Sequence, residues 1–528
     1  MIVRLVCAQI CRDYTLAHGI GHNDRNIWLV AELQSITMQT LRIITSACFF
    51  SILFAGSFAA TAAQAANDQK RPNIVYMYAD DWRWDCIGVE QKERGDKGRF
   101  PWLETPRLDK LAREGVRFRN SFVVNSLCSP GRACVLTSRY SHLNGIIGNS
   151  KPMSPDTPTL GTQMKKAGYS TAYCWKFHMD SQRERPGFDY VASFIGQGKY
   201  NDCPILLNGK QTPTHGWIDD ISTDYAIKFL QKQTNDKPFF LWLGFKSPHD
   251  PRGGENLPER DRELYEGKES RPVPNMSVTA IFKEVQPTPG RSARRPGGPF
   301  EAHRAYMRHI TAIDQCVGRV LDALESTGHA DDTIVIAASD NGYYLGEHEL
   351  GDKRSAYDES MRVPLLVRLP GKTAKRGITS DAMVLNIDYA PTILDFAAAD
   401  PLPDAQGRSL RPLLNGERPD DWRKAFFYEY FKEPNFTSPT VLAVRTDTQK
   451  LITYPGHDEW TEAFDLVNDP YEMKNLVADK SLMKELRSQF DAEAKAVKFQ
   501  MPKIPEAADK PPANAKRKNR PADADTGG

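Results

Sequence analysis

Short apolar runs alternate with stretches of helical periodicity along most of the chain. The runs have the length and the β-branched or aromatic character of buried strands, whereas the stretches between them repeat apolar residues every three or four positions. The expected strands are Ile74–Tyr78, Ser170–Trp175, Phe239–Phe245, Thr333–Ala338 and Pro364–Arg368. The expected helices are Thr105–Glu114, Thr159–Ala167, Ser222–Gln231, Ala302–Leu324 and Asp388–Phe396. This alternation predicts an α/β fold in which helices flank both faces of a large, mostly parallel sheet.

The pattern changes beyond about Pro401. The apolar runs Phe426–Phe431 and Val441–Tyr454, the second broken at residues 446–448, predict a small antiparallel sheet, and Lys480–Val497 predicts a helix. We therefore expect a large domain at residues 70–400, a small C-terminal subdomain at 401–500 and a disordered tail at 501–528, where the composition cannot bury a core. Residues 251–299, rich in Pro, Gly and charge, are expected to form either one wall of a pocket or a solvated insertion.

The N-terminal region carries a targeting pattern. Arg42 precedes an apolar stretch at Ile43–Ala60, and Ala63-Gln64-Ala65 has the small-x-small form of a cleavage site. We interpret residues 38–65 as a signal peptide, too short for a stable membrane anchor, and residues 1–37 as a mis-called start. An exported protein, periplasmic or secreted, is expected.

Composition excludes some classes of function. Of the 528 residues, 40% are apolar and 26% charged, as in ordinary globular proteins, and the formal charge of +2 gives no basis for nucleic-acid binding. The cysteines beyond the expected cleavage site are sparse and show no CxxC or Cys/His cluster, so neither a disulfide framework nor a zinc site is predicted from them.

Two acidic clusters follow expected strands. Asp80-Asp81 end the first strand, and Asp340-Asn341 end the strand through Ala338. A lone Asp-Asp pair is usually a helix cap or a solvated turn. Two clusters at the carboxyl ends of strands in one sheet instead favour a bound cation. Carboxylates and an amide oxygen form a hard ligand set, which suits Ca²⁺ or Mg²⁺ and not zinc.

A second group of chemistry-bearing residues surrounds Cys128-Ser129-Pro130-Gly131-Arg132. A helix expected to begin at Pro130 would turn Arg132 back toward the cysteine, and its free N–H groups would attract an anion. The alternative for Cys128 is a buried structural thiol. Further candidates stand just past expected strands or acidic clusters: Lys176, His178, His249 and Lys353. Cations can neutralise the oxygens of an anionic ester, and a histidine can move a proton.

These motifs together resemble the type I, formylglycine-dependent sulfatases of the alkaline phosphatase superfamily. Residues 128–132 match Cys-x-Pro-x-Arg, the signature at which that family has its cysteine oxidised to formylglycine. The other matching segments are Asn73–Asp81, Lys176–His178, Ser247–Pro251, Ser339–Gly342 and Ala463–Pro470. The segment Lys353–Arg368 is more similar to the carbohydrate-sulfatase branch than to simple arylsulfatases. The resemblance implies an alkaline phosphatase-like fold.

The resemblance also implies a role for each candidate residue. It makes Asp80, Asp81, Asp340 and Asn341 the ligands of one Ca²⁺ ion, together with the formylglycine (3-oxoalanine) formed from Cys128 by a maturation enzyme. Arg132 would steady the hydrated aldehyde, and Lys176 and Lys353 would hold the sulfate oxygens. His178 would be the base that collapses the sulfated diol, and His249 would protonate the leaving alcohol of a sulfated carbohydrate.

One departure from the family pattern and two alternative functions stay open. The family often has glycine where this chain has Trp175, so a different local backbone is expected there. A phosphate monoester or diester hydrolase of the same superfamily is one alternative function. The other is a sulfated-glycan-binding protein in which Cys128 is never converted.

Overall fold

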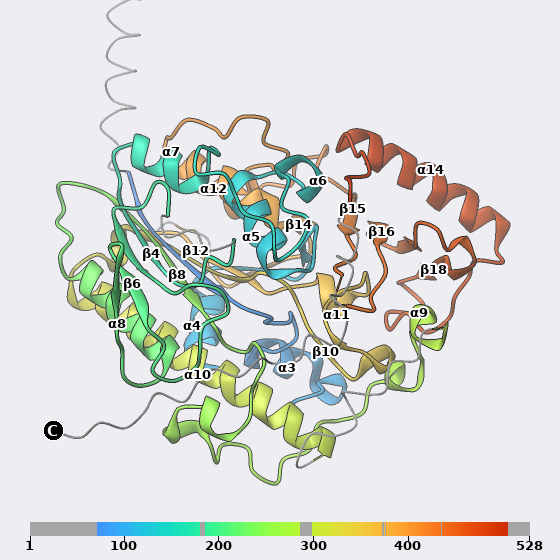
Figure 1. The fold of residues 1–528 in the computed structure, drawn as a ribbon, viewed down its shortest axis with the longest axis horizontal. Helices are drawn as coiled ribbons and strands as arrows, with labels where there is room; N and C mark the ends of the chain where they lie inside the picture. Colours follow the sequence, from blue (N-terminus) through green and yellow to red (C-terminus); the bar gives the residue numbers. More distant parts are fainter. Residues whose placement is uncertain are drawn as a thin grey trace, which may run out of the picture. The chain divides into compact units, whose positions relative to one another are not determined.

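A large mixed sheet forms the centre of the protein in this computed structural model (Figure 1), which describes residues 71–179, 185–285, 298–371, 374, 376–434 and 436–504. The expected signal peptide, the residues before it and most of the expected tail lie outside these ranges. Within them, every helix is too short or too polar to span a lipid bilayer.

Ten strands make up the large sheet. In spatial order they are β13 (Ile378–Ser380), β2 (Val116–Phe118), β12 (Leu365–Arg368), β9 (Thr333–Ser339), β1 (Asn73–Ala79), β8 (Phe239–Phe245), β4 (Ser170–Cys174), β5 (Tyr190–Ser193), β6 (Ile205–Leu207) and β7 (Lys210–Thr212). The strands from β9 to β5 run parallel, which confirms the predicted α/β class. The sheet is mixed toward both edges, because β12 pairs antiparallel with β9 and with β2, and β6 pairs antiparallel with β5 and β7.

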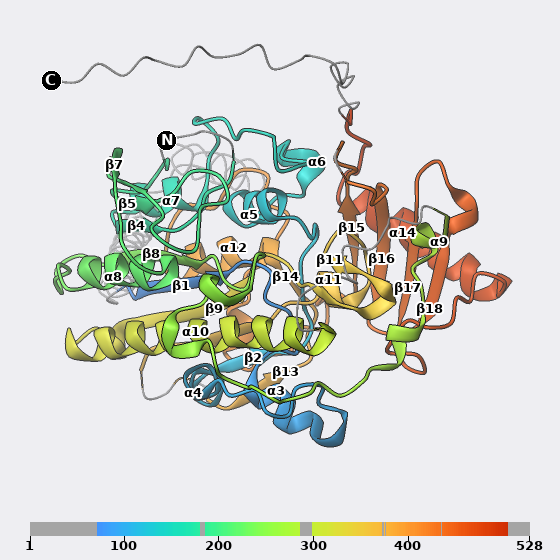
Figure 2. The same ribbon diagram turned by 60° about the horizontal axis from the view of Figure 1, so that its bottom comes forward.

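Helices cover both faces of this sheet (Figure 2). One face carries α4 (Pro106–Glu114), α8 (Ile218–Leu230) and α10 (Gly298–Ser326), and the other carries α5 (Cys128–Thr137), α7 (Leu160–Lys166) and α12 (Tyr389–Phe396). The central strands β1, β8 and β9 are buried along their whole length. This double coverage explains why their sequences read as continuous apolar runs without polar alternation.

Shorter elements connect these layers. They are α3 (Gly88–Arg94), β3 (Ser121–Phe122), α6 (Ser141–Asn144), α9 (Ile281–Val285), β10 (Tyr344–Leu345), β11 (Gly351–Asp352), α11 (Asp358–Met361), β14 (Val384–Leu385) and α13 (Arg411–Leu414). Three-residue and four-residue 3₁₀ turns, among them η4 (Pro274–Ser277) and η6 (Glu347–Glu349), punctuate the described part of the long 251–299 segment and the loop after β10.

A second, four-stranded sheet follows in the C-terminal part of the chain, as predicted. Its antiparallel strands are β15 (Ala425–Tyr430), β16 (Val441–Thr446), β17 (Gln449–Thr453) and β18 (Glu462–Asp465). Helix α14 (Lys480–Ala496) packs Met483 and Leu486 against Val444 and Leu451 on one face of this sheet. The boundary expected at residue 400 stays a prediction.

Gly244, in the centre of the large sheet, leaves space for the side chain of Trp175. The β4–β8 register places Trp175, just beyond β4, beside Gly244, and a Cβ at Gly244 would overlap the Trp175 ring. The buried indole in turn lies 4.3 Å from the guanidinium carbon of Arg132. Trp175 therefore packs against Arg132 in the space that Gly244 leaves open. The different local backbone expected at position 175 stays a prediction.

Replacing this glycine tests the packing. We expect Gly244→Ala to lower the free energy of unfolding by about 1–3 kcal/mol, because the added methyl group overpacks a site that cannot expand. The measurement is urea unfolding followed by far-UV circular dichroism. Gly253→Ala is the matched control, since no atom lies within 4 Å of the Cβ it would add. Equal stability of both variants and the parent would contradict the packing described here.

Candidate active site

The register of β1 and β9 brings the two acidic clusters together. These neighbouring parallel strands pair Ala79 with Ser339, so Asp80 and Asp340 leave the sheet side by side. The backbone N–H of Asp81 donates to Oδ1 of Asp340 at 3.0 Å. Carboxylate oxygens of Asp80, Asp81 and Asp340 all lie within 4.8 Å of one another, and the three residues are buried.

The donor set fits a hard divalent cation. Asn341 donates through Nδ2 to Asp81 Oδ1 at 2.7 Å and to the Gly342 carbonyl at 2.8 Å, whereas its buried Oδ1 has no hydrogen-bond partner among the described residues. An unpaired buried amide oxygen beside three carboxylates is the arrangement that Ca²⁺ or Mg²⁺ would satisfy. Burial, reinforced by Asp80, raises the pKa of Asp340 to about 8, which reflects the cost of holding these charges together without a cation.

Cys128 lies against this cluster. It is the first residue of α5, so the expectation that the helix begins at Pro130 is wrong: the chain turns helical directly after the extended Leu127. The thiol donates to Asp80 Oδ1 at 3.6 Å and accepts from Lys353 Nζ at 3.3 Å. Burial raises the pKa of Cys128 to about 11, so the side chain stays a protonated thiol and a poor nucleophile.

Three buried cations face the carboxylates. Arg132 donates through one terminal nitrogen to Asp340 Oδ2 at 2.6 Å and lies 3.3 Å from Asp80 Oδ2. Lys176 pairs with Asp80, and Lys353 pairs with Asp81. Although burial opposes it, the positive charge around Asp80 holds the pKa of that carboxyl well below its ordinary value. Burial also opposes the charged form of Lys353, yet Asp81 raises the pKa of this ammonium well above its usual range.

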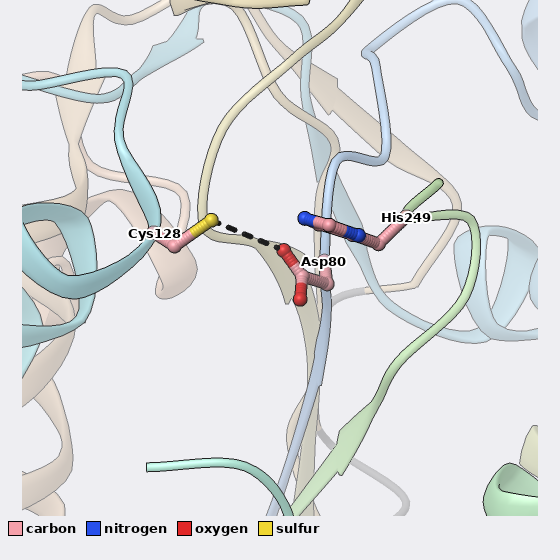
Figure 3. Close-up of side chains that lie close together, drawn as sticks. All are labelled: Asp80, Cys128 and His249. Carbon is pink, nitrogen blue, oxygen red and sulfur yellow. Dashed lines mark hydrogen bonds between the residues drawn. The ribbon is translucent and has the colours of Figure 1, made fainter. Parts of the chain in front are cut away.

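Both candidate histidines lie close to Asp80 and Cys128. His249 and Cys128 approach Asp80 from opposite sides (Figure 3), and a ring nitrogen of His249 lies within 4.8 Å of the Cys128 sulfur and an Asp80 oxygen. His178 is tied to the Cys128 turn, because Ser129 Oγ donates to its carbonyl. Burial lowers the pKa of both histidines, so both rings are neutral near pH 7.

The site includes polar residues that the motifs did not reveal. Gln197 accepts from Lys176 Nζ through its side chain at 2.7 Å and from Lys246 Nζ through its carbonyl at 3.0 Å. Asn149 accepts from the backbone N–H of Ser129 at 3.0 Å and so caps the helix that carries Cys128. No local sequence signal marks either residue, because each reaches the site through a loop between distant elements.

The site thus gathers every predicted residue in one place. Asp80, Asp81, Asp340 and Asn341 could hold a cation, and Cys128, Arg132, Lys176, His178, His249 and Lys353 surround it. The arrangement can bind an anion beside a divalent ion. It leaves the thiol protonated, so the encoded side chains offer no strong nucleophile at this position.

Two family models and several curated proteins match this chain. A family model described as sulfatase matches residues 72–399, and a second, described as the C-terminal part of N-sulphoglucosamine sulphohydrolase, matches residues 346–500. An N-acetylglucosamine-6-O-sulfatase of Bacteroides thetaiotaomicron is 34% identical over 80% of this chain and 86% of its own. An ulvan-active sulfatase of Formosa agariphila is 29% identical over 87% of both chains.

The fold of this chain is also similar to that of a solved structure. It is a complex of a protein with its substrate D-glucosamine-2-N,6-O-disulfate, and it superimposes with a TM-score of 0.72. That protein is 31% identical to this chain, and the match covers 81% of this chain and 98% of that one.

A metal-binding measurement tests the acidic cluster. We expect Asp81→Asn to weaken calcium binding by at least about tenfold, because it removes one anionic ligand while preserving shape. Asparagine also tolerates the left-handed backbone of position 81, where φ is 75°. Isothermal titration with calcium gives the affinities, and Asp331→Asn is the control, because Asp331 is an exposed carboxylate in the 3₁₀ turn that precedes β9. Unchanged affinity in Asp81→Asn would show that the cluster is not the cation site.

Proposed function

This chain belongs to the sulfatase family, whose members hydrolyse sulfate esters, and from that premise we propose that it is an exported, calcium-dependent carbohydrate sulfatase with a formylglycine at position 128. The observation that carries the proposal is the position of the Cys128 sulfur. It lies between the Asp80 carboxylate and the Lys353 ammonium, where a nucleophile would meet both the bound cation and the anionic ester.

The nucleophile needs a change at Cys128 itself. The protonated, buried thiol is a poor attacking group. A formylglycine there supplies a hydrated aldehyde, one hydroxyl of which can attack sulfur, and a bound calcium supplies positive charge for the ester oxygens. Carboxylates of Asp80, Asp81 and Asp340, with the free amide oxygen of Asn341, would hold that calcium.

The surrounding cations provide the anion site. Lys176 and Lys353 are buried beside Asp80 and Asp81, so each ammonium is already oriented toward the position of the reacting group. Preorganised positive charge of this kind stabilises the negative oxygens of a transition state without further reorganisation. Arg132, held between Asp340 and the Trp175 ring, would steady residue 128.

The histidines supply the proton transfers. A neutral His178 has a free lone pair and would accept a proton from the remaining hydroxyl of the sulfated diol, in keeping with its buried Nδ1, which has no hydrogen-bond partner in the described part of the chain. His249, on the opposite side of Asp80, would protonate the leaving alcohol. Its pKa is low in the free protein, and the negative charge of a bound sulfate ester would favour the protonated ring that this role needs.

A sulfated sugar is the proposed substrate class. The support is the name of the first relative, an N-acetylglucosamine-6-O-sulfatase, and the glucosamine disulfate bound in the similar solved structure. An exported enzyme would meet such polysaccharides outside the cell, and the targeting pattern at residues 38–65 supports export. 6-O-sulfated glucosamine is therefore the first substrate to assay.

Sulfate release tests the proposal. We expect the full chain from its native host to release sulfate from 6-O-sulfated N-acetylglucosamine, and Cys128→Ala to reduce the rate by at least about a thousandfold, because the covalent nucleophile is lost. Matched sulfate and phosphate esters of one alcohol are compared by kcat/KM. A higher value for phosphate would replace the proposal with a phosphoesterase. Glycan binding that survives in Cys128→Ala, without sulfate release by the parent, would replace it with a binding protein.

A further inference from the structure

A second cluster of side chains of the kinds that can bind a metal ion lies where the loop after β10, helix α11 and the segment after β18 meet. His348 in η6, Glu359 in α11 and Glu472 after β18 place ligand atoms within 4.8 Å of one another. All three side chains are at least nine-tenths buried. Asn275 of η4 closes the cluster, donating through Nδ2 to Glu359 Oε1 at 2.8 Å.

Several buried polar atoms in and beside this cluster have no hydrogen-bond partner among the described residues. Nδ1 of His348, Oε2 of Glu359 and Oδ1 of Asn275 are buried and lack hydrogen-bond partners within the described ranges. The His348 ring is fixed in place, because it stacks on Tyr357 at 3.9 Å and its Nε2 lies 3.2 Å from Asn275 Nδ2. Buried polar atoms are rarely left unsatisfied in native proteins, so three in one cluster indicate a missing partner.

The charges of the cluster do not balance either. Lys450 is shared between Asp358 Oδ1 at 2.7 Å and Glu472 Oε1 at 2.6 Å, and Arg445 also binds Asp358. Among the residues with described positions, no cation lies within ion-pair distance of Glu359. A buried carboxylate without a cation is costly, since its solvation is lost and not replaced.

We propose that this cluster is a second, structural metal site that binds a divalent cation of the zinc class through His348, Glu359 and Glu472. One imidazole nitrogen with two carboxylates is a set that zinc accepts, whereas calcium prefers oxygen ligands alone. The protein would thus hold two chemically different ions, a hard one beside Cys128 and a borderline one here.

The protonation of the ligands fits such an ion. Burial lowers the pKa of His348 to about 4, so its ring is neutral and has a lone pair to offer. Burial raises the pKa of Glu359 to about 7 and that of Glu472 to about 8, which reflects the cost of ionising two neighbouring carboxyls that have no cation between them. Metal binding at such a site releases protons, as expected where ligands must be deprotonated.

The position of the site gives the ion a structural role. It would join η6 and α11 to the segment that follows β18, more than a hundred residues further along the chain. The backbone of α11 also supports the active site, since the carbonyl of Ser360 accepts from the N–H of Gly342 at 2.8 Å, next to the candidate ligand Asn341. A Cβ at Gly342 would overlap the Glu359 carbonyl, so this contact is close.

Metal counting tests the inference independently of sulfate release. The full chain is equilibrated with calcium and zinc, dialysed and analysed by inductively coupled plasma mass spectrometry. We expect about one tightly bound zinc per chain in the parent, retained in Asp340→Asn, and lost in Glu359→Gln, which removes one anionic ligand. Glu349→Gln is the matched control, because Glu349 lies in the same turn as His348 with its side chain exposed.

The melting temperature, measured with and without zinc, tests the proposal even if Glu359→Gln folds poorly. Added zinc should raise the melting temperature of the parent and of Asp340→Asn, because it binds only the folded state. No zinc retained by the parent, or zinc that disappears only in Asp340→Asn, would overturn the proposal. The proposal would also be overturned if Glu359→Gln had the same stability and the same metal content as the parent. That result is expected if Glu359 is a protonated acid that binds no metal.

Discussion

The balance of buried charge at the ends of β1 and β9 is the constraint on which the rest of this structure depends. Parallel pairing of the two strands forces Asp80, Asp81 and Asp340 into one buried cluster, and Arg132, Lys176 and Lys353 compensate them. Removing one member of such a network leaves an unpaired buried charge, which costs far more than the pair contributes. A divalent cation bound there would leave an excess of positive charge, the condition for holding an anionic ester.

Much of the remaining fold positions the groups around that cluster. Trp175 fits under Arg132 only because Gly244 has no side chain, and α5 begins at Cys128 itself, so the reacting position lies at a helix N-terminus. The C-terminal part of the chain takes part as well. Glu433 accepts from the N–H of Asn149 at 2.9 Å and pairs with Arg354 at 3.0 Å, thereby linking the cap of α5 to the residue after Lys353.

The strands, the helices and the clustering of the candidate residues could be predicted from the sequence because each has a local signal. Apolar runs mark β1, β8 and β9, and acidic or basic residues directly after a strand mark the rim. The direction of β12, the contact of Gln197 with Lys176 and the meeting of His348 with Glu472 could not be predicted. These depend on long-range packing, for which one sequence carries no periodic signal. The helix start at Cys128 was missed because Pro130 is also compatible with the third position of a helix.

The most direct test of the account is the mass of the peptide that contains residue 128, taken from protein secreted by its native host. The buried, protonated thiol beside Asp80 and Lys353 is a poor nucleophile, so the account requires another group at that position. The account predicts the mass of an aldehyde in place of the thiol. An ordinary cysteine at position 128 in the secreted protein would contradict the sulfatase mechanism for this chain.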